Sequence, residues 1–218
     1  MIPKPCLANT LSLVIQSNSH PCRTFSAAAV HTDGRSFIPP SWDTIDDRVR
    51  GGSSHSYLLP LSANGARFHG TLDIENLGGA GFASQFSPVP GSNGSNSAQG
   101  ELQSNEVSRE DIAWDLGGYD GIEIAYSRGD GKVYTFIIKD AMGSGNRADE
   151  REMASVSWEV KFKAQEDGGT VWKPWRDFKA FYRGKEKDDA GQLKTHEVRR
   201  IGLMMRRFAS QTMELILC

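Results

Sequence analysis

Apolar and polar residues alternate with a period of two in several short segments of this chain. Residues 66–74 and 156–163 follow this alternation, whereas residues 133–138 carry apolar side chains on both faces. Because successive side chains of a strand point to opposite faces, these segments predict two half-buried strands and one central strand. Residues 198–205 and 213–217 predict two more strands. No long amphipathic helix is evident, so the sequence predicts an all-β sandwich of two sheets, of the jelly-roll type.

Two glycine clusters lie between predicted strands. Residues 129–131, Gly-Asp-Gly, follow a short alternating segment over residues 122–126, and such a loop between two β-rich runs predicts a hairpin. Residues 78–81, Gly-Gly-Ala-Gly, have no helix after them and so lack the helix N-terminus of a phosphate-binding loop. Both clusters are interpreted as tight turns, in which glycine supplies a positive φ.

Length and composition favour one globular domain. The chain has 218 residues, of which 38% are hydrophobic and 24% charged, and we expect a single sandwich domain over residues 40–218 after a tail over residues 1–39. Residues 87–113 are rich in Ser, Gly, Asn and Pro, which predicts a mobile insertion between two strands. The polar residues 140–154 and 183–196 predict exposed loops.

The charge and hydropathy patterns argue against a nucleic-acid surface and against a transmembrane segment. The formal net charge is -2 and Lys and Arg are scattered among acids, so no dedicated nucleic-acid surface is expected. No apolar run approaches the roughly 20 residues that span a bilayer, so we expect no transmembrane segment.

The N-terminal tail has the composition of a mitochondrial presequence. The first 32 residues contain no acid, carry Lys4 and Arg23, and are rich in Ser and Ala. If residues 7–16 are helical, one side gathers Leu7, Leu11, Val14 and Ile15. Residues 23–26, Arg-Thr-Phe-Ser, match a processing pattern that leaves Ser26 as the mature N-terminus. The alternative is an ordinary disordered tail. We therefore expect a mitochondrial location on the matrix side, with a cytoplasmic one as the alternative.

Cysteine and histidine usage predicts no metal or disulfide framework. Cys6 and Cys22 lie in the tail and Cys218 is the last residue. No two of the histidines stand at metal-ligand spacing, and there is no GxSxG elbow. His69, on the polar face of its strand, is interpreted as a solvated side chain. We expect no catalytic, cofactor or metal site.

Residues 42–56, WDTIDDRVRGGSSHS, combine an aromatic anchor, acids, arginines, a glycine pair and serines. This mixture predicts a structured turn that leads into a strand. Asp46 and Asp47 would point apart on a strand, so we favour a structural interpretation, in which one caps backbone N–H groups and the other pairs with Arg48 or Arg50, over an acid-base pair. A calcium site that also uses Asp43 is a further alternative.

The densest aromatic cluster lies in residues 171–184, VWKPWRDFKAFYRG. Exposed aromatic side chains are how many sandwich modules hold sugars, so a carbohydrate-binding face is one interpretation. The favoured interpretation is that Trp172, Trp175 and Phe178 cover the core. Arg183 would bind a partner's carboxylate or pair locally.

In this order, four blocks of the chain resemble the complex I intermediate-associated protein 30 family. They are residues 42–56, residues 68–85 (FHGTLDIENLGGAGFASQ), residues 119–136 (YDGIEIAYSRGDGKVYTF) and residues 171–184. The resemblance covers residues 40 to 217. It implies a sandwich similar to the galactose-binding jelly rolls and a non-catalytic role in the assembly of mitochondrial NADH:ubiquinone oxidoreductase.

The resemblance also implies partners, namely complex I assembly intermediates and other assembly factors, with peripheral association to the inner membrane through them. A carbohydrate-binding or other ligand-binding module is the alternative function, and nucleic-acid association is a weaker one. Within the matching motifs, the candidate partner-binding surface consists of Asp46, Asp47, Arg50, Gly51, Gly52, Ser53, Trp172, Trp175 and Arg183.

Overall fold

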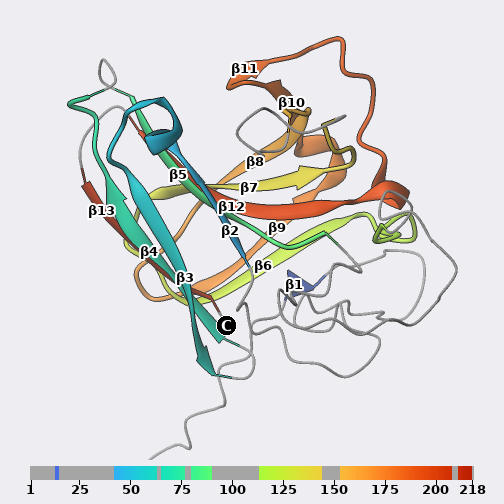
Figure 1. The fold of residues 1–218 in the computed structure, drawn as a ribbon. Helices are drawn as coiled ribbons and strands as arrows, with labels where there is room; N and C mark the ends of the chain where they lie inside the picture. The colour runs from blue at the N-terminus through green and yellow to red at the C-terminus, as the bar shows by residue number, and fades with distance from the viewer. Residues whose placement is uncertain are drawn as a thin grey trace, which may run out of the picture.

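The computed structural model describes residues 13–14, 42–62, 65–76, 80–89, 113–143, 153–207 and 211–217. Within these residues, antiparallel strands form two sheets, with only short 3₁₀ turns besides (Figure 1). The predicted all-β jelly-roll sandwich is therefore confirmed. No helix among the described residues is both long and apolar enough to cross a membrane.

One sheet has six strands within the described part of the chain. Its order is β1-β6-β13-β4-β3, and β9 pairs with β6. The strands are β1 (Leu13–Val14), β3 (His55–Ser62), β4 (Gly65–Leu72), β6 (Gly121–Arg128), β9 (Gly169–Pro174) and β13 (Gln211–Leu217).

The second sheet has seven strands in the same described ranges, in the order β11-β10-β8-β7-β12-β5-β2. These are β2 (Asp43–Asp46), β5 (Gly81–Phe86), β7 (Val133–Lys139), β8 (Ser157–Lys163), β10 (Lys179–Tyr182), β11 (Lys185–Glu186) and β12 (Arg200–Arg207). The 3₁₀ turns are η2 (Asp47–Arg50), η4 (Trp175–Asp177) and η5 (Thr195–Glu197). As the unbroken apolar segment predicted, β7 lies in the middle of this sheet.

The core between the sheets is filled by side chains that the alternating pattern predicted to point inward. Phe68 of β4 and Tyr134 of β7 are fully buried, and their ring centroids lie 6.0 Å apart at an interplanar angle of 72°. Tyr134 also stacks on Phe162 of β8 at 5.9 Å. Edge-to-face and offset aromatic contacts of this kind add to the stabilisation from burial. They join the two sheets through one aromatic cluster.

The hairpin prediction at residues 129–131 is wrong. β6, before the loop, belongs to the six-stranded sheet, and β7, after it, belongs to the seven-stranded sheet. The loop therefore carries the chain from one sheet to the other. Gly131 has φ 73°, as expected of a turn glycine. Local sequence predicts the turn but does not specify which sheet the next strand joins.

Most of the tail and of the predicted insertion lie outside the described residues. Of residues 1–39 only β1 is described, and it is extended and pairs with β6, with Leu13 opposite Ile124. The other residues of the segment 7–16, for which a helix was considered, lie outside the described ranges. The processing pattern at residues 23–26, the polar stretch 90–112 and the loop residues 144–152 also fall outside the described ranges.

Candidate partner-binding surface

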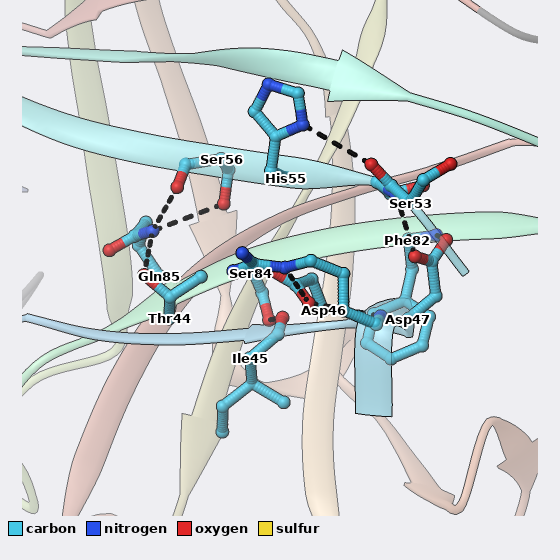
Figure 2. Close-up of polar contacts among 12 residues, drawn as sticks. Thr44, Ile45, Asp46, Asp47, Ser53, His55, Ser56, Phe82, Ser84 and Gln85 are labelled. Carbon is cyan, nitrogen blue, oxygen red and sulfur yellow. Dashed lines mark hydrogen bonds and ion pairs between the residues drawn. The ribbon is translucent and has the colours of Figure 1, made fainter. Parts of the chain in front are cut away.

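Asp47 is the buried centre of the motif at residues 42–56. Its Oδ1 accepts a hydrogen bond from the Ser54 backbone N–H at 2.9 Å, and its Oδ2 accepts one from Phe82 N–H at 3.2 Å (Figure 2). Its main-chain oxygen accepts from Gly52 N–H at 3.0 Å. Ser54 leads into β3 of one sheet and Phe82 lies in β5 of the other. One carboxylate thus ties the edge strand β3 of one sheet and the strand β5 of the other to the η2 turn.

Asp46 serves the same turn in a different way. Its carboxylate caps η2 by accepting from Arg48 N–H at 3.1 Å, and it also accepts from the Arg48 guanidinium, with Nη2 to Oδ2 at 2.7 Å. Hydrogen bonding to Asp46 raises the pKa of Arg48 above its usual value. The two acids therefore make separate structural contacts and do not converge as an acid-base pair. The structural interpretation assigned the capping of backbone N–H groups to one acid and the pairing with an arginine to the other. Asp46 does both.

Gly81 is part of this assembly because it has no side chain. A Cβ at Gly81 would lie 2.6 Å from the Asp73 carbonyl oxygen and 3.0 Å from Ser54 Oγ. Ser54 Oγ also donates to that carbonyl at 3.2 Å and accepts from Asp73 N–H at 3.0 Å. Gly81 is the first residue of β5, so its interpretation as a turn residue is wrong. Close packing of three segments requires this glycine. Gly78 and Gly79 lie outside the described residues.

Beside the buried contacts lies an exposed polar group. Ser53 Oγ donates to the Asp73 carboxylate, Asn76 Nδ2 lies 3.2 Å from Ser53 Oγ, and His55 Nδ1 lies 3.3 Å from the Ser53 carbonyl. The Ser53 hydrogen bond lowers the pKa of Asp73. His55 faces a main-chain oxygen and not the serine hydroxyl. The group therefore lacks the serine-histidine contact of a nucleophilic triad.

A second set of buried polar contacts was not predicted from the sequence. Gln85 Nε2, in β5, donates to Thr44 Oγ1 at 2.8 Å and to the Ser56 carbonyl at 2.8 Å (Figure 2). Ser84 Oγ donates to the Ile45 carbonyl at 2.5 Å. These bonds fasten β2 and β3 to β5. The one signal in the sequence is the glutamine itself, since an amide that becomes buried needs hydrogen-bonding partners.

The remaining residues of the first motif are accessible. Arg50, Gly51 and Ser53 are exposed, and Gly52 is half-buried. Gly51 has φ 88° and ends η2, which is the left-handed conformation that favours glycine. The Arg50 guanidinium lies 5.9 Å from the centroid of the Phe82 ring. Four of the six candidates in this motif therefore reach the surface, and the two acids do not.

The aromatic block divides into buried and exposed parts. Phe178 is buried, and Trp175 packs against the core, with its Nε1 donating to the Tyr119 carbonyl at 2.6 Å. Trp172 in β9 is 37% exposed, so the expectation that it covers the core is wrong. β9 pairs with β6, and Trp172 lies opposite Glu123 on the outer face of that sheet, away from the core residues Ile122 and Ile124.

Arg183 lies at the turn between β10 and β11. Arg183 and Gly184 have φ 52° and 81°, as the two central residues of a tight hairpin turn require. The Arg183 side chain is exposed and its guanidinium lies 5.3 Å from the Tyr182 ring centroid. In Figure 1 this hairpin is well separated from η2. The nine candidate residues therefore do not gather at one place.

Two arginines near the C-terminus form ion pairs with acids of other strands. Arg200 is buried; its Nε donates to the Ser87 carbonyl at 2.8 Å and its guanidinium pairs with Asp43. Arg206 pairs with the buried Glu159. Burial raises the pKa of Glu159 despite the attraction of Arg206. Glu159 was predicted to point to solvent, and that prediction is wrong because Arg206 covers it.

The acids considered for a cation site have other partners. Asp43 pairs with Arg200, and the carboxylates of Asp46 and Asp47 accept the bonds described above. The described residues contain no group of three metal-ligating side chains. The calcium alternative therefore has no support in their arrangement.

Comparison with known proteins identifies a family and several solved structures of weaker likeness. The model of the family described as "Complex I intermediate-associated protein 30 (CIA30)" matches residues 31–217. An uncharacterized protein of Schizosaccharomyces pombe, C9E9.15, is 32% identical over 179 residues, which cover 78% of this chain and 73% of that protein.

The solved structures similar to this chain include the family 11 carbohydrate-binding module of the cellulase Lic26A-Cel5E of Clostridium thermocellum. It is 12% identical with a TM-score of 0.48, over 81% of this chain and 86% of the module. A Clostridium thermocellum family 11 module in complex with a β-1,3-1,4-mixed-linked tetrasaccharide is 11% identical with a TM-score of 0.47, over 81% and 87% of the two chains.

Proposed function

Because the chain belongs to the complex I intermediate-associated protein 30 family, we propose that it binds assembly intermediates of respiratory complex I and catalyses no reaction itself. The observation that carries this proposal is the family match over residues 31–217, which spans all the described strands except β1. The contacts of Asp46 and Asp47 support it, because both acids fasten the turn that joins the sheets. The protein acts in mitochondria, on the matrix side, together with other assembly factors.

Depletion of the protein tests this function. If it holds unfinished membrane-arm intermediates, its loss stops complex I assembly while the other respiratory complexes stay at normal levels. Native gels of isolated mitochondria should show accumulated complex I subassemblies, and the tagged protein should migrate with one of them. Normal complex I levels after depletion, or recovery of the protein from the cytosol alone, would contradict the proposal.

A carbohydrate-binding module is the second candidate, and the observation that favours it is the exposed face of Trp172. A sugar ring that stacks on an indole typically gains from both apolar contact and CH-π attraction. Titration with oligosaccharides should then give saturable binding that Trp172→Ala abolishes. A flat response with the unmodified chain would dismiss this candidate and leave the assembly function unaffected.

A further inference from the structure

Strand β6 of the six-stranded sheet is not covered equally on its two sides. Along one side, β9 pairs with it from Gly121 to Tyr126. On the other side, β13 pairs with it only at Tyr126 and Arg128. No further strand among the described residues from position 42 onward pairs with β6. Residues 121–125 of β6 therefore have no strand of the sandwich domain beside them on the side of β13. We call this segment the β6 gap.

The N-terminal segment β1 lies in the β6 gap. Leu13 pairs with Ile124 and Val14 pairs with Glu123, and β1 is seen beside β6 in Figure 1. The same two residues of β6 already pair with β9 on their other side. Because a strand residue has one neighbouring strand on each side, β1 must lie on the side of β13. Part of the N-terminal tail thus continues the sheet where β13 ends.

The other sheet edges carry features that hinder the addition of a further strand. β3 contains Pro60 with an irregular register beside it, β9 ends in Lys173 and Pro174, and β2 and β11 are four and two residues long. Proline, lysine, bulges and short length are common protections of a sheet edge. The β6 gap, Gly-Ile-Glu-Ile-Ala, has neither proline nor lysine. Among the edges that the structure describes, it is the one best suited to accept a strand.

The buried side chains of β6 define what an added strand must carry. Ile122 and Ile124 are 1% and 2% exposed and belong to the core. Residues that stand directly opposite each other in an antiparallel pair lie on the same face of the sheet. A strand that fills the β6 gap must therefore place an apolar residue opposite Ile124, because a charged side chain on the core side would lose its hydration. The register with β1 has a leucine at this position.

The processing pattern at residues 23–26 stands between β1 and the sandwich domain in the sequence. Cleavage before Ser26 would remove β1 with the rest of the tail and leave β2 to β13 in the chain. The β6 gap would then be open on the side of β13. An open edge presents backbone N–H and C=O groups to other chains, and partner proteins bind such edges by adding a strand of their own.

We propose that the β6 gap is a strand-acceptor site, which β1 closes in the unprocessed chain and an extended segment of a partner protein fills after processing. This segment pairs antiparallel with residues 121–125 and carries an apolar residue opposite Ile124, because β1 has this register on the same edge. Before processing, the tethered β1 competes with a partner at a high effective concentration. The inference rests on the proposed function, since it names the edge through which the mature protein binds an assembly intermediate.

A fluorescent peptide of residues 8–18 tests the acceptor site with purified full-length chains. In the release variant, Leu13→Pro with Val14→Pro removes the backbone N–H groups of both paired residues of β1. The matched control, Ser17→Pro with Asn18→Pro, changes the same tail outside β1, and neither variant alters the sandwich domain. Fluorescence anisotropy should show about tenfold tighter peptide binding to the release variant than to the unmodified chain or the control. Equal affinities for the three chains, or equal binding of a peptide with prolines at positions 13 and 14, would overturn the inference.

Native gels separate the acceptor site from the proposed function. The three tagged chains are added to detergent-solubilised mitochondria of cells depleted of the protein. The release variant should co-migrate with a complex I intermediate about tenfold more than the other two chains, and the peptide of residues 8–18 should displace it, unlike the proline peptide. If all three chains co-migrate equally and the peptide displaces none, the acceptor site is wrong and the assembly function stands. If the release variant binds the peptide but no chain co-migrates with an intermediate, the acceptor site stands and the assembly function is wrong.

The processing step has a test of its own. Mass spectrometry of the protein from mitochondria should show a chain that begins at Ser26. A mature chain that keeps Leu13 and Val14, or a peptide that displaces only a second copy of this chain, would overturn the inference.

Discussion

At the scale of single residues, Asp47 makes the contacts that the fold can least replace. Asp47→Ala would leave the backbone N–H groups of Ser54 and Phe82 without acceptors in a buried place. An unsatisfied buried donor costs about 1–3 kcal/mol, so we expect the free energy of unfolding to fall by about 3 kcal/mol. Urea unfolding followed by circular dichroism measures this change.

The matched control for Asp47 is Arg50→Ala in the same motif. Arg50 is exposed and lies over the Phe82 ring, a contact that contributes about 1 kcal/mol or less. A loss at Arg50 as large as that at Asp47 would show that the motif is stabilised by its surface contacts and not by the buried carboxylate.

Gly81 gives a second prediction at this scale. In Gly81→Ala the new Cβ would lie 2.6 Å from the Asp73 carbonyl, which forces the two chain segments apart. Overpacking of this kind costs about 1–3 kcal/mol, which thermal unfolding should detect as a lower Tm. Gly118→Ala is the control, because a Cβ there meets nothing within 4 Å. Equal Tm values for the two variants would rule out close packing as the reason for glycine at position 81.

At the scale of elements, Asp130 fixes the loop that carries the chain between the sheets. Its Oδ2 accepts from Lys132 Nζ at 2.7 Å and from Glu214 N–H, in β13, at 3.0 Å, and its side chain is 16% exposed. Burial acts to raise the pKa of Asp130, but the bonds from Lys132 and Glu214 outweigh it and hold that pKa below its usual value. The carboxylate therefore stabilises the fold only while it is ionised.

The sign of the pH dependence follows from that depressed pKa. The contribution of Asp130 is fully present above the unfolded value near 4 and is lost as the pH falls through the lower, folded value. Asp130→Asn should reduce the free energy of unfolding by about 1–3 kcal/mol at pH 7, and the difference should shrink in urea titrations below pH 4. Asp167→Asn, at an exposed turn, should show no such change. A deficit that stays constant with pH would contradict the role of the charge.

The alternating apolar pattern predicted the strands better than it predicted which strands and side chains lie next to one another. Phe68 and Phe162 are buried as their strand patterns indicated. Glu159 follows the same pattern and points away from the core, yet Arg206 of a distant strand covers it. Trp172 is exposed although it is a tryptophan, because it lies opposite Glu123 on the outer face of its sheet. Facts of this kind depend on which strands become neighbours, and a single segment does not contain that information.

The candidate site was predicted only in part, because a single segment does not show which remote segments it contacts. In the block at residues 42–56, the turn leading into a strand was interpreted correctly, because glycine, serine and aspartate favour such turns locally, but Asp43–Asp46 form the strand β2, which was not predicted. The partners of its acids, Phe82 of β5 among them, come from segments that are remote in sequence. The exposure of Tyr57 and Leu59 was not predicted, since both look like ordinary strand residues until the edge position of β3 is known.

At the scale of the whole molecule, the order of strands predicts one cooperative unit. The chain enters the seven-stranded sheet with β2, leaves it for β3 and β4, returns with β5, and continues to cross between the sheets until β13. Each sheet therefore combines strands from both halves of the chain, and no cut would separate two independent cores. We infer a single sandwich domain, which should unfold in one two-state transition.

Two probes of one urea titration measure that cooperativity. Tryptophan fluorescence reports on the surroundings of the five tryptophans, among them the buried Trp158 in the seven-stranded sheet, and far-ultraviolet circular dichroism reports on the strands of both sheets. Because Asp47 and Asp130 each tie one sheet to the other or to a crossover loop, Asp47→Ala and Asp130→Asn should lower both midpoints by the same amount and leave the two curves superimposed. Separate midpoints, or a variant that shifts only one probe, would mean that the two sheets unfold independently.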